Sequence, residues 1–264
     1  MKKLTKKLHT LWHLDWRWAG KYYKKKIKQY LGYLGSKLKG KKYWEVSIEG
    51  VKIKLSFSNY YQHHLANLSS QGRQENQLLK IWKKQSENKN IVVDLGGYNG
   101  IFGLISAAAN PASRVYIFEP DTINYNHIKV NINLNQVKNV EVVKAAVADQ
   151  TGPVSFNLHA GGPGGSIADS GLEVDCWKLD DFFQHRELPT LMKFDIEGAE
   201  CRALLGAKQI LIKNKPAMLL EVHQKFLSRY GDSTQVIDRF LQAIGYKKLW
   251  LDQNEFTTHY WVHL

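Results

Sequence analysis

The chain has only two cysteines, Cys176 and Cys201, in 264 residues. They form no C-x-x-C pair and have no histidine at ligand spacing, which excludes a disulfide framework and a structural zinc site. The sequence also lacks the run of about 18 apolar residues that a membrane-spanning helix needs. Charged residues within 11–17 interrupt the apolar stretch that a signal peptide would require. We therefore expect a cytoplasmic protein.

The composition is that of a globular protein, with 44% hydrophobic and 23% charged residues. The length suits one large α/β domain with an appendage. The net charge of +13 is confined to one segment, because residues 1–42 contain 14 lysines and arginines and one acidic residue. The other 222 residues contain 23 charges of each sign. A neutral body thus follows a strongly basic N-terminal segment.

The basic segment has an apolar stripe. Leu4, Leu8 and Leu11 recur at helical spacing between lysines, which predicts a basic amphipathic helix from residue 1 to about residue 14. Residues 1–42 can bind an anionic membrane surface, pack on the body or another copy, or contact nucleic acid; the last is the least favoured. Alternation over 45–55 predicts a small hairpin. We divide the chain into an extension, 1–70, and a main domain, 71–264.

The main domain alternates apolar strands with helices. Strands are predicted at 91–95, 114–119, 140–145, 191–195, 217–223, 246–252 and 258–263, and helices at 101–109, 122–135, 199–213 and 232–244. This order predicts an α/β fold with a doubly wound, mostly parallel, seven-stranded sheet whose last two strands form an antiparallel hairpin. The glycine-rich residues 161–166 are either a mobile cover over a cleft or a simple hairpin loop.

The first central strand ends in Asp94-Leu95-Gly96-Gly97, a glycine turn before a helix. Such turns aim backbone N–H groups at a ligand. Glu119 ends the neighbouring strand, where a carboxylate accepts hydrogen bonds from ribose hydroxyls. No G-x-G-x-x-G register fits, because Tyr98 stands where the second glycine belongs, and G-x-x-x-x-G-K-[ST] is absent. A nucleoside bound without a phosphate cradle is therefore expected.

Three motifs over about residues 72–224 resemble the FkbM family of S-adenosylmethionine-dependent methyltransferases, which have a Rossmann-like class I fold. They are Val93-Asp94-Leu95-Gly96-Gly97-Tyr98-Asn99-Gly100, then Phe118-Glu119-Pro120, and then Met192-Lys193-Phe194-Asp195-Ile196-Glu197-Gly198-Ala199-Glu200 followed by Leu220-Glu221-Val222-His223. Two positions depart from the family pattern: Gly97 replaces the usual alanine, and Tyr98 replaces the usual asparagine.

The resemblance implies S-adenosylmethionine as the cofactor. Its methionine end would lie at the turn, with the turn amides facing its carboxylate and Asp94 bonding through water or to its amino group. Glu119 would take the ribose hydroxyls, and Asp149 would either meet the adenine or be an exposed loop acid. The implied cofactor-binding set is Asp94, Gly96, Gly97, Tyr98, Gly100, Glu119, Pro120, Asp149 and Asp195.

The acceptor would lie at the ends of the strands that carry Asp195 and His223. The unperturbed pKa of histidine suits His223 as a base, Asp195 can bind the acceptor hydroxyl or orient His223, and Glu221 lies beside them. Glu197, Ser166 and Lys193 are candidate substrate contacts, with a structural ion pair equally open for Lys193. We interpret Glu200 as a helix N-terminal residue.

The resemblance implies O-methylation of a sugar, glycolipid or secondary metabolite, so that a small molecule or glycan would be the acceptor. A divalent metal is possible, although the spacing gives it little support. Two alternatives stay open. One is an RNA methyltransferase guided by the basic segment, although N/D-P-P-Y/F is absent and nucleic acid is not the expected partner. The other is a non-catalytic module at the inner membrane surface or on a protein partner.

Overall fold

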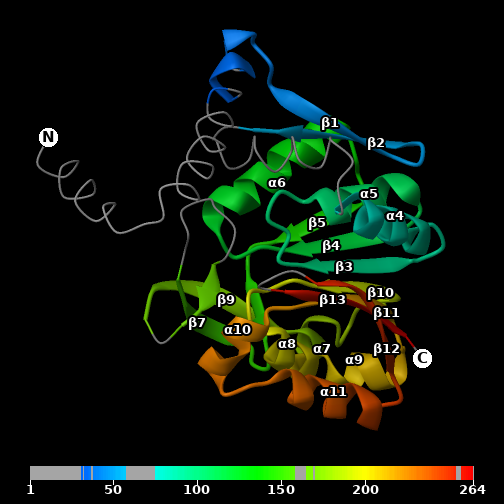
Figure 1. The fold of residues 1–264 in the computed structure, drawn as a ribbon, viewed down its shortest axis with the longest axis vertical. Helices are drawn as coiled ribbons and strands as arrows, with labels where there is room; N and C mark the ends of the chain where they lie inside the picture. The colour runs from blue at the N-terminus through cyan, green and yellow to red at the C-terminus, as the bar shows by residue number, and fades with distance from the viewer. Residues whose placement is uncertain are drawn as a thin grey trace, which may run out of the picture.

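A seven-stranded sheet forms the centre of the fold in the computed structural model (Figure 1). The structure describes residues 31–57 except 32 and 37, 75–157, 165–253 except 169, and 257–263. The strand order is β12 (Lys247–Gln253), β13 (Thr258–His263), β11 (Ala217–Val222), β10 (Leu191–Phe194), β3 (Ile91–Leu95), β4 (Arg114–Phe118), β5 (Val140–Val143). Strands β11 to β5 are parallel in this order, whereas β13 pairs antiparallel with both β11 and β12. The predicted sheet and its C-terminal antiparallel hairpin are confirmed.

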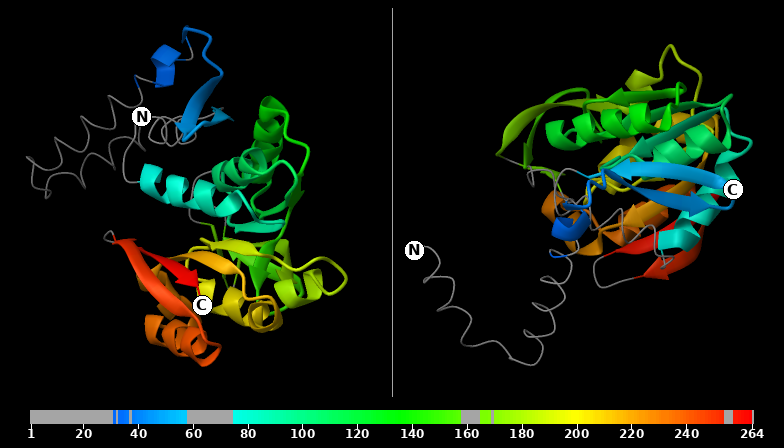
Figure 2. Two further views of the ribbon diagram at one scale, coloured as in Figure 1. Left: turned by 90° about the vertical axis from the view of Figure 1, so that its right-hand side faces the viewer. Right: turned by 90° about the horizontal axis from the view of Figure 1, so that it is seen from above.

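Helices cover both faces of this sheet (Figure 2). Val92 is buried in one core and its neighbour Val93 in the other, as expected for a parallel strand covered on both sides. The first face carries α4 (Glu75–Ser86), α5 (Ile101–Ala109) and α6 (Thr122–Asn135). The second carries α7 (Leu179–Phe182), α8 (Glu200–Gly206), α9 (Lys208–Lys213) and α11 (Thr234–Ala243). None of the helices in the described ranges is long and apolar enough to cross a membrane.

The structure departs from the predicted elements in two places. The third strand ends at Val143, and Ala146–Ala148 (β6) begins a separate four-stranded sheet instead of extending it. That sheet has the order β6, β9 (Leu172–Lys178), β7 (Gly152–Asn157), β8 (Ser166–Ile167). The helix predicted over 199–213 is divided at Ala207 into α8 and α9.

Strands β7 and β9 pair antiparallel, so they form the hairpin that flanks the glycine-rich stretch. Residues 158–164 and 169, most of the predicted cover, lie outside the described residues. The predicted basic helix over 1–14 lies outside them too, as does the predicted division between residues 70 and 71.

The hairpin of β1 (Tyr43–Ile48) and β2 (Val51–Ser56) is confirmed, and it packs on α6. Its apolar side chains belong to the same core as those of α4 and α5. Asn131 Oδ1 accepts the Ser56 N–H at 2.9 Å, while Asn131 Nδ2 donates to the Asn99 carbonyl at 2.8 Å. One α6 side chain therefore joins the hairpin to the turn between β3 and α5.

Candidate active site

The turn after β3 passes against the end of β10. Gly96 has φ +78°, and a β-carbon there would lie 1.8 Å from the backbone oxygen of Asp195, so only glycine fits. The Gly96 and Gly97 N–H groups donate to the Phe118 carbonyl at 3.1 and 3.0 Å, and the Gly100 N–H donates to the Gly97 carbonyl at 2.7 Å. The Gly96 and Gly97 N–H groups therefore hold the turn against β4, and the Gly100 N–H closes the turn on itself. These three groups are bonded within the protein, while the contact of the turn amides with a ligand carboxylate stays a prediction.

Ile117 explains the glycine at position 97. A β-carbon at Gly97 would lie 2.2 Å from Ile117 Cγ2, and one at Gly103 would lie 2.4 Å from Ile117 Cδ1. Both positions lie on the segment from β3 into α5, and the Ile117 side chain of β4 fills the space that two β-carbons would occupy. The missing methyl groups thus bring α5 close to the sheet.

Glu119 follows β4 and lies beside this turn. Its side-chain oxygens accept the Tyr98 N–H at 2.8 Å and the Asp121 N–H at 2.9 Å. The residue is only 6% exposed, and burial raises the pKa of its carboxyl to about 7 against these two hydrogen bonds, which lower it. A carboxylate has about four acceptor positions, so acceptor capacity is left for a ligand.

A pocket of about 250 Å³ opens directly after Glu119. It lies between the start of α6 and the strand β9. Its lining residues are Pro120, Thr122, Lys144, Leu172, Glu173, Val174 and Asp175. The pocket adjoins the carboxyl ends of β4 and β5, the edge where α/β sheets bind ligands.

Asp94 is turned inward. Its Oδ2 atom accepts the Gly103 N–H at 3.1 Å and its Oδ1 atom lies 3.7 Å from Lys193 Nζ. Burial raises the pKa of this carboxyl although Lys193 opposes the shift. Asp94 therefore links β3 to α5 and to β10 through groups of the protein itself.

Lys193 lies between the carboxylates of Asp195 and Asp94. Its Nζ atom is 2.8 Å from Asp195 Oδ2 and the side chain is 3% exposed. Burial lowers the pKa of Lys193, but Asp195 and Asp94 outweigh it and the pKa is raised overall. Burial likewise raises the pKa of Asp195, but Lys193 and His223 hold it below its usual value. The structure thus favours the ion pair over the substrate contact for Lys193.

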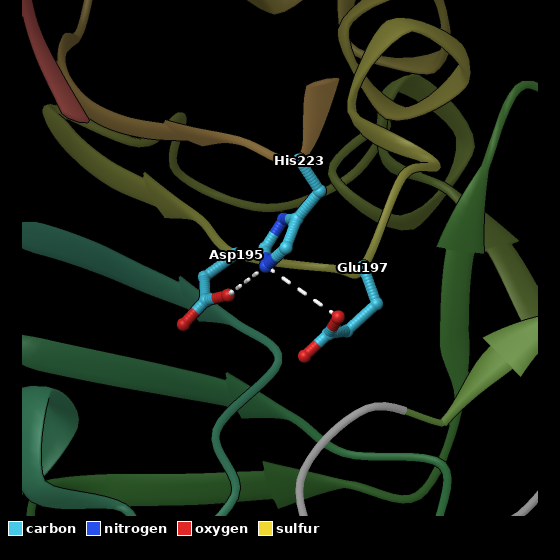
Figure 3. Close-up of side chains that lie close together, drawn as sticks. All are labelled: Asp195, Glu197 and His223. Atoms are coloured by element: carbon cyan, nitrogen blue, oxygen red, sulfur yellow. Dashed lines mark ion pairs between the residues drawn. The ribbon is translucent and has the colours of Figure 1, made fainter. Parts of the chain in front are cut away.

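His223 follows β11 and lies at the centre of a group of carboxylates (Figure 3). Its Nδ1 atom lies 2.8 Å from Glu200 Oε1, and its Nε2 atom lies 3.5 Å from Glu197 Oε2 and 3.8 Å from Asp195 Oδ1. Burial lowers the pKa of His223, but the Glu200 hydrogen bond and Asp195 raise it to about 9. The sequence analysis assumed the unperturbed pKa of histidine for His223, and this assumption does not apply. With the raised pKa the imidazole is protonated at neutral pH.

Glu197 has the unusual backbone conformation of φ 55°, in the left-handed region. Its side chain is 22% exposed. Burial raises the pKa of Glu197 to about 7 although His223 lowers it. A half-buried carboxyl with a pKa near neutrality is suited to accept and return a proton.

Two residues of this group were not predicted in their roles. Glu200, the first residue of α8, is fully buried, and its Oε1 atom also accepts the Gly198 N–H at 2.9 Å. It therefore orients His223, which the sequence left open as one of two roles for Asp195, the other being to bind the acceptor hydroxyl. His259 lies opposite Glu221 across β13 and β11, with Nε2 3.0 Å from Glu221 Oε2. Only the strand register could have indicated this pair.

Two predicted site residues lie elsewhere. Asp149 is exposed at the end of β6 and its backbone lies against α8 near Gly206, because the chain has left the large sheet by then. Ser166 is buried in β8, where it pairs with Asn157. The two candidate ligand regions are thus the pocket beside Pro120 and the carboxylate group around His223. Asp195, Glu197 and His223 together offer donor atoms within 4.8 Å of one another, close enough to hold a metal ion.

This arrangement of sheet and helices occurs in known methyltransferases. The S-adenosylmethionine-dependent methyltransferase from Agrobacterium tumefaciens superposes with a TM-score of 0.50 at 12% identity, covering 84% of this chain and 70% of that one. At this identity the likeness concerns the fold alone. The methyltransferase FkbM from Methylobacillus flagellatus KT gives a TM-score of 0.49 at 16% identity, covering 77% of this chain and 54% of that one.

The family follows from the sequence comparison. The family model for the methyltransferase FkbM domain matches residues 94–248, more than half of the chain. The chain belongs to this family, as the resemblance of its motifs predicted. A curated relative, Methyltransferase 1 from Beauveria bassiana (strain ARSEF 2860), is 25% identical in an alignment 146 residues long, and the match covers 44% of this chain and 58% of that protein. The chain spans only a little over half the length of this relative and of the FkbM structure.

Proposed function

We propose that this chain binds S-adenosylmethionine at the carboxyl ends of β3 and β4. One observation carries the proposal: the buried Glu119 carboxylate, fixed by two backbone N–H groups, lies between the glycine turn and the pocket at Pro120. Its remaining acceptor positions suit the two hydroxyls of a ribose, and the pocket suits the adenine. The glycine turn then lies beside the methionine end, toward Asp195.

We further propose that the methyl acceptor is a hydroxyl group of a sugar, glycolipid or secondary metabolite. The hydroxyl oxygen forms a bond to the methyl carbon while the carbon–sulfur bond breaks, and its electron pair stays on sulfur as an uncharged thioether. The hydroxyl proton passes to a carboxylate. Glu197, with its pKa of about 7, is the best placed acceptor, because His223 is protonated at neutral pH. Asp195 and Glu221 orient the acceptor and balance the charge of His223.

The test has a binding arm and a transfer arm. Titration calorimetry should give saturable binding of S-adenosylmethionine and S-adenosylhomocysteine, and no binding of NAD or ATP. Methyl-labelled S-adenosylmethionine should then label a fraction of a lysate separated by polarity. Asp195→Asn should retain cofactor binding and lose the labelling. A folded chain that does not bind S-adenosylmethionine would refute the proposed function. Methyl label found in RNA would show that the acceptor is RNA and not a sugar, glycolipid or secondary metabolite.

For residues 1–42 we propose contact with an anionic membrane surface from the cytoplasmic side. The support is the segment's excess of 13 positive charges together with its apolar stripe. Vesicles with anionic lipid should sediment the full chain and not a chain that begins at residue 43. Equal sedimentation of both would contradict the proposal, and steeply salt-dependent retention on RNA would favour nucleic acid instead.

A further inference from the structure

The carboxylate group around His223 has an excess of negative charge. Within the described residues, the basic partners of these carboxylates are Lys193, His223 and His259. Five carboxylates share them: Asp94, Asp195, Glu197, Glu200 and Glu221. The side chains of Asp94 and Glu200 are almost fully buried, whereas those of Asp195, Glu197 and Glu221 are 28, 22 and 19% exposed. Carboxylates gathered in such excess in a partly buried place are costly unless a further positive charge joins them.

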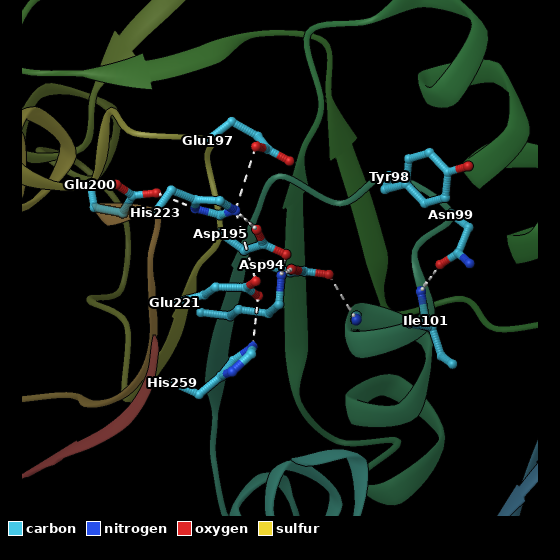
Figure 4. A network of polar contacts seen from close by, with 12 residues as sticks. Asp94, Tyr98, Asn99, Ile101, Asp195, Glu197, Glu200, Glu221, His223 and His259 are labelled. Carbon is cyan, nitrogen blue, oxygen red and sulfur yellow. Dashed lines mark hydrogen bonds and ion pairs between the residues drawn. The ribbon is translucent and has the colours of Figure 1, made fainter. Parts of the chain in front are cut away.

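The carboxylates are divided in a regular way. Asp195 gives Oδ2 to Lys193 and turns Oδ1 toward His223, while Glu221 gives Oε2 to His259 and turns Oε1 toward His223. Glu197 Oε2 also faces His223. Three carboxylates from three separate residues thus present one oxygen each to the same imidazole nitrogen (Figure 4).

That nitrogen, His223 Nε2, makes no hydrogen bond within the part of the chain that the structure describes. The side chain is 6% exposed, and the three oxygens lie 3.5, 3.8 and 3.8 Å away. These are distances for charge attraction and not for hydrogen bonds. Glu200 fixes the opposite nitrogen, Nδ1, and so holds Nε2 toward the oxygens. A carboxylate that bonds the far nitrogen is a usual support for a metal-ligating histidine.

The spacing fits a cation at the centre. Ligands at about 2.0–2.2 Å from a metal lie about 3 Å apart when adjacent and about 4 Å apart when opposite. The donor atoms of Asp195, Glu197 and His223 all lie within 4.8 Å of one another, so small side-chain rotations suffice (Figure 3). Asp195 and Glu197 are partly exposed, which leaves room for such rotations, and Lys193 holds only the Oδ2 atom of Asp195.

We propose that Asp195, Glu197 and the Nε2 atom of His223 form a binding site for a divalent cation, with Glu221 close enough to serve as a fourth donor. Without the cation the imidazole is protonated at neutral pH, so the cation takes the place of the Nε2 proton when it binds. One nitrogen with carboxylate oxygens suits Mn²⁺ better than Mg²⁺, which prefers oxygen alone. The site leaves coordination positions open on the exposed side of Asp195 and Glu197. A hydroxyl bound there would lose its proton more easily. This last step rests on the proposed function, whereas cation binding does not.

The test uses the full chain after treatment with EDTA and contains no S-adenosylmethionine. Titration with Mn²⁺, followed by electron paramagnetic resonance and calorimetry, should show one saturable site. Asp195→Asn and Glu197→Gln should each weaken Mn²⁺ at least about tenfold, and Glu200→Gln about 10- to 100-fold. The matched control Glu141→Gln removes an exposed carboxylate that pairs with Arg114 and should leave binding unchanged.

Circular dichroism and thermal melting check that each variant is folded. Glu197→Gln keeps the experiment decisive if Glu200→Gln unfolds, because Glu197 is on the partly exposed side. Absence of saturable Mn²⁺ binding in the wild type would overturn the site, as would equal binding in folded Glu197→Gln. Cofactor binding measured separately in EDTA reports on the proposed function, so that the two failures are distinguishable.

Discussion

Replacing Glu119 by glutamine should weaken S-adenosylmethionine binding severely at nearly constant shape. The carboxylate holds the Tyr98 and Asp121 N–H groups and leaves acceptor capacity for the ribose hydroxyls. Hydrogen bonds to a charged group contribute about 1.5–3 kcal/mol, against about 0.5–1.5 kcal/mol for a neutral one. Glutamine loses the charge for both ribose bonds and one of its acceptor atoms. The expected loss is about 2–4 kcal/mol, or roughly 30- to 1,000-fold in the dissociation constant.

The assay is titration calorimetry of wild type, Glu119→Gln and the control Glu141→Gln at pH 6 and pH 8. The ionised carboxylate binds the hydroxyls, and its pKa of about 7 leaves it mostly protonated at pH 6. Wild type should therefore bind about tenfold more weakly at pH 6 than at pH 8, beyond any change in Glu119→Gln. Affinities of wild type and Glu119→Gln within about twofold at pH 8 would refute the role of Glu119.

Three further predictions concern stability, measured by urea denaturation. The pKa of Glu119 is raised to about 7 in the folded protein, so as the pH rises the unfolded chain loses this proton first. The free energy of unfolding of the wild type should therefore fall by about 3 kcal/mol relative to that of Glu119→Gln between pH 4.5 and pH 8. Parallel plots of this free energy against pH for the two proteins would exclude the effect. Gly96→Ala should cost more than about 4 kcal/mol because its β-carbon meets backbone, whereas Gly50→Ala, at φ +89° in open space, should cost only about 1–2 kcal/mol. Lys193→Met should cost about 3–5 kcal/mol by leaving buried carboxylates unpaired, and Asp94→Asn should recover part of that loss in the double variant; strict additivity would disprove the coupling.

The sequence predicted the elements whose pattern is local. The helices over 101–109 and 122–135 have the predicted bounds, because apolar spacing and the flanking turns define both ends. The β6 to β9 sheet was missed because β6 has only three residues and follows β5 after two, so the two read as one apolar run. Gly206, the last residue of α8, is the only local signal of the break at Ala207, and it is a weak one because a single glycine is tolerated inside a helix at a cost of about 1 kcal/mol.

For the candidate site, the sequence predicted which residues stand at the ends of strands, but not how their side chains contact one another. Asp195, His223 and Glu119 were placed at one sheet edge because parallel strands end together there. The direction of each side chain was not accessible: Asp94 points inward, and Glu200 binds His223 across two elements. Likewise, the pKa of about 9 for His223 depends on three carboxylates, Glu200, Asp195 and Glu197, that tertiary packing brings together.

Gly97, Gly103 and Ile117 compete for the same space, so a substitution at one of these positions constrains the residues that the other two can hold. A β-carbon at residue 97 or 103 requires the volume that the isoleucine now occupies. In family members with alanine at the position of Gly97, we therefore expect a smaller or differently branched side chain at the position of Ile117. Substitutions at these positions should therefore occur in pairs during evolution. The single substitution Gly97→Ala should destabilise this protein as long as Ile117 is kept.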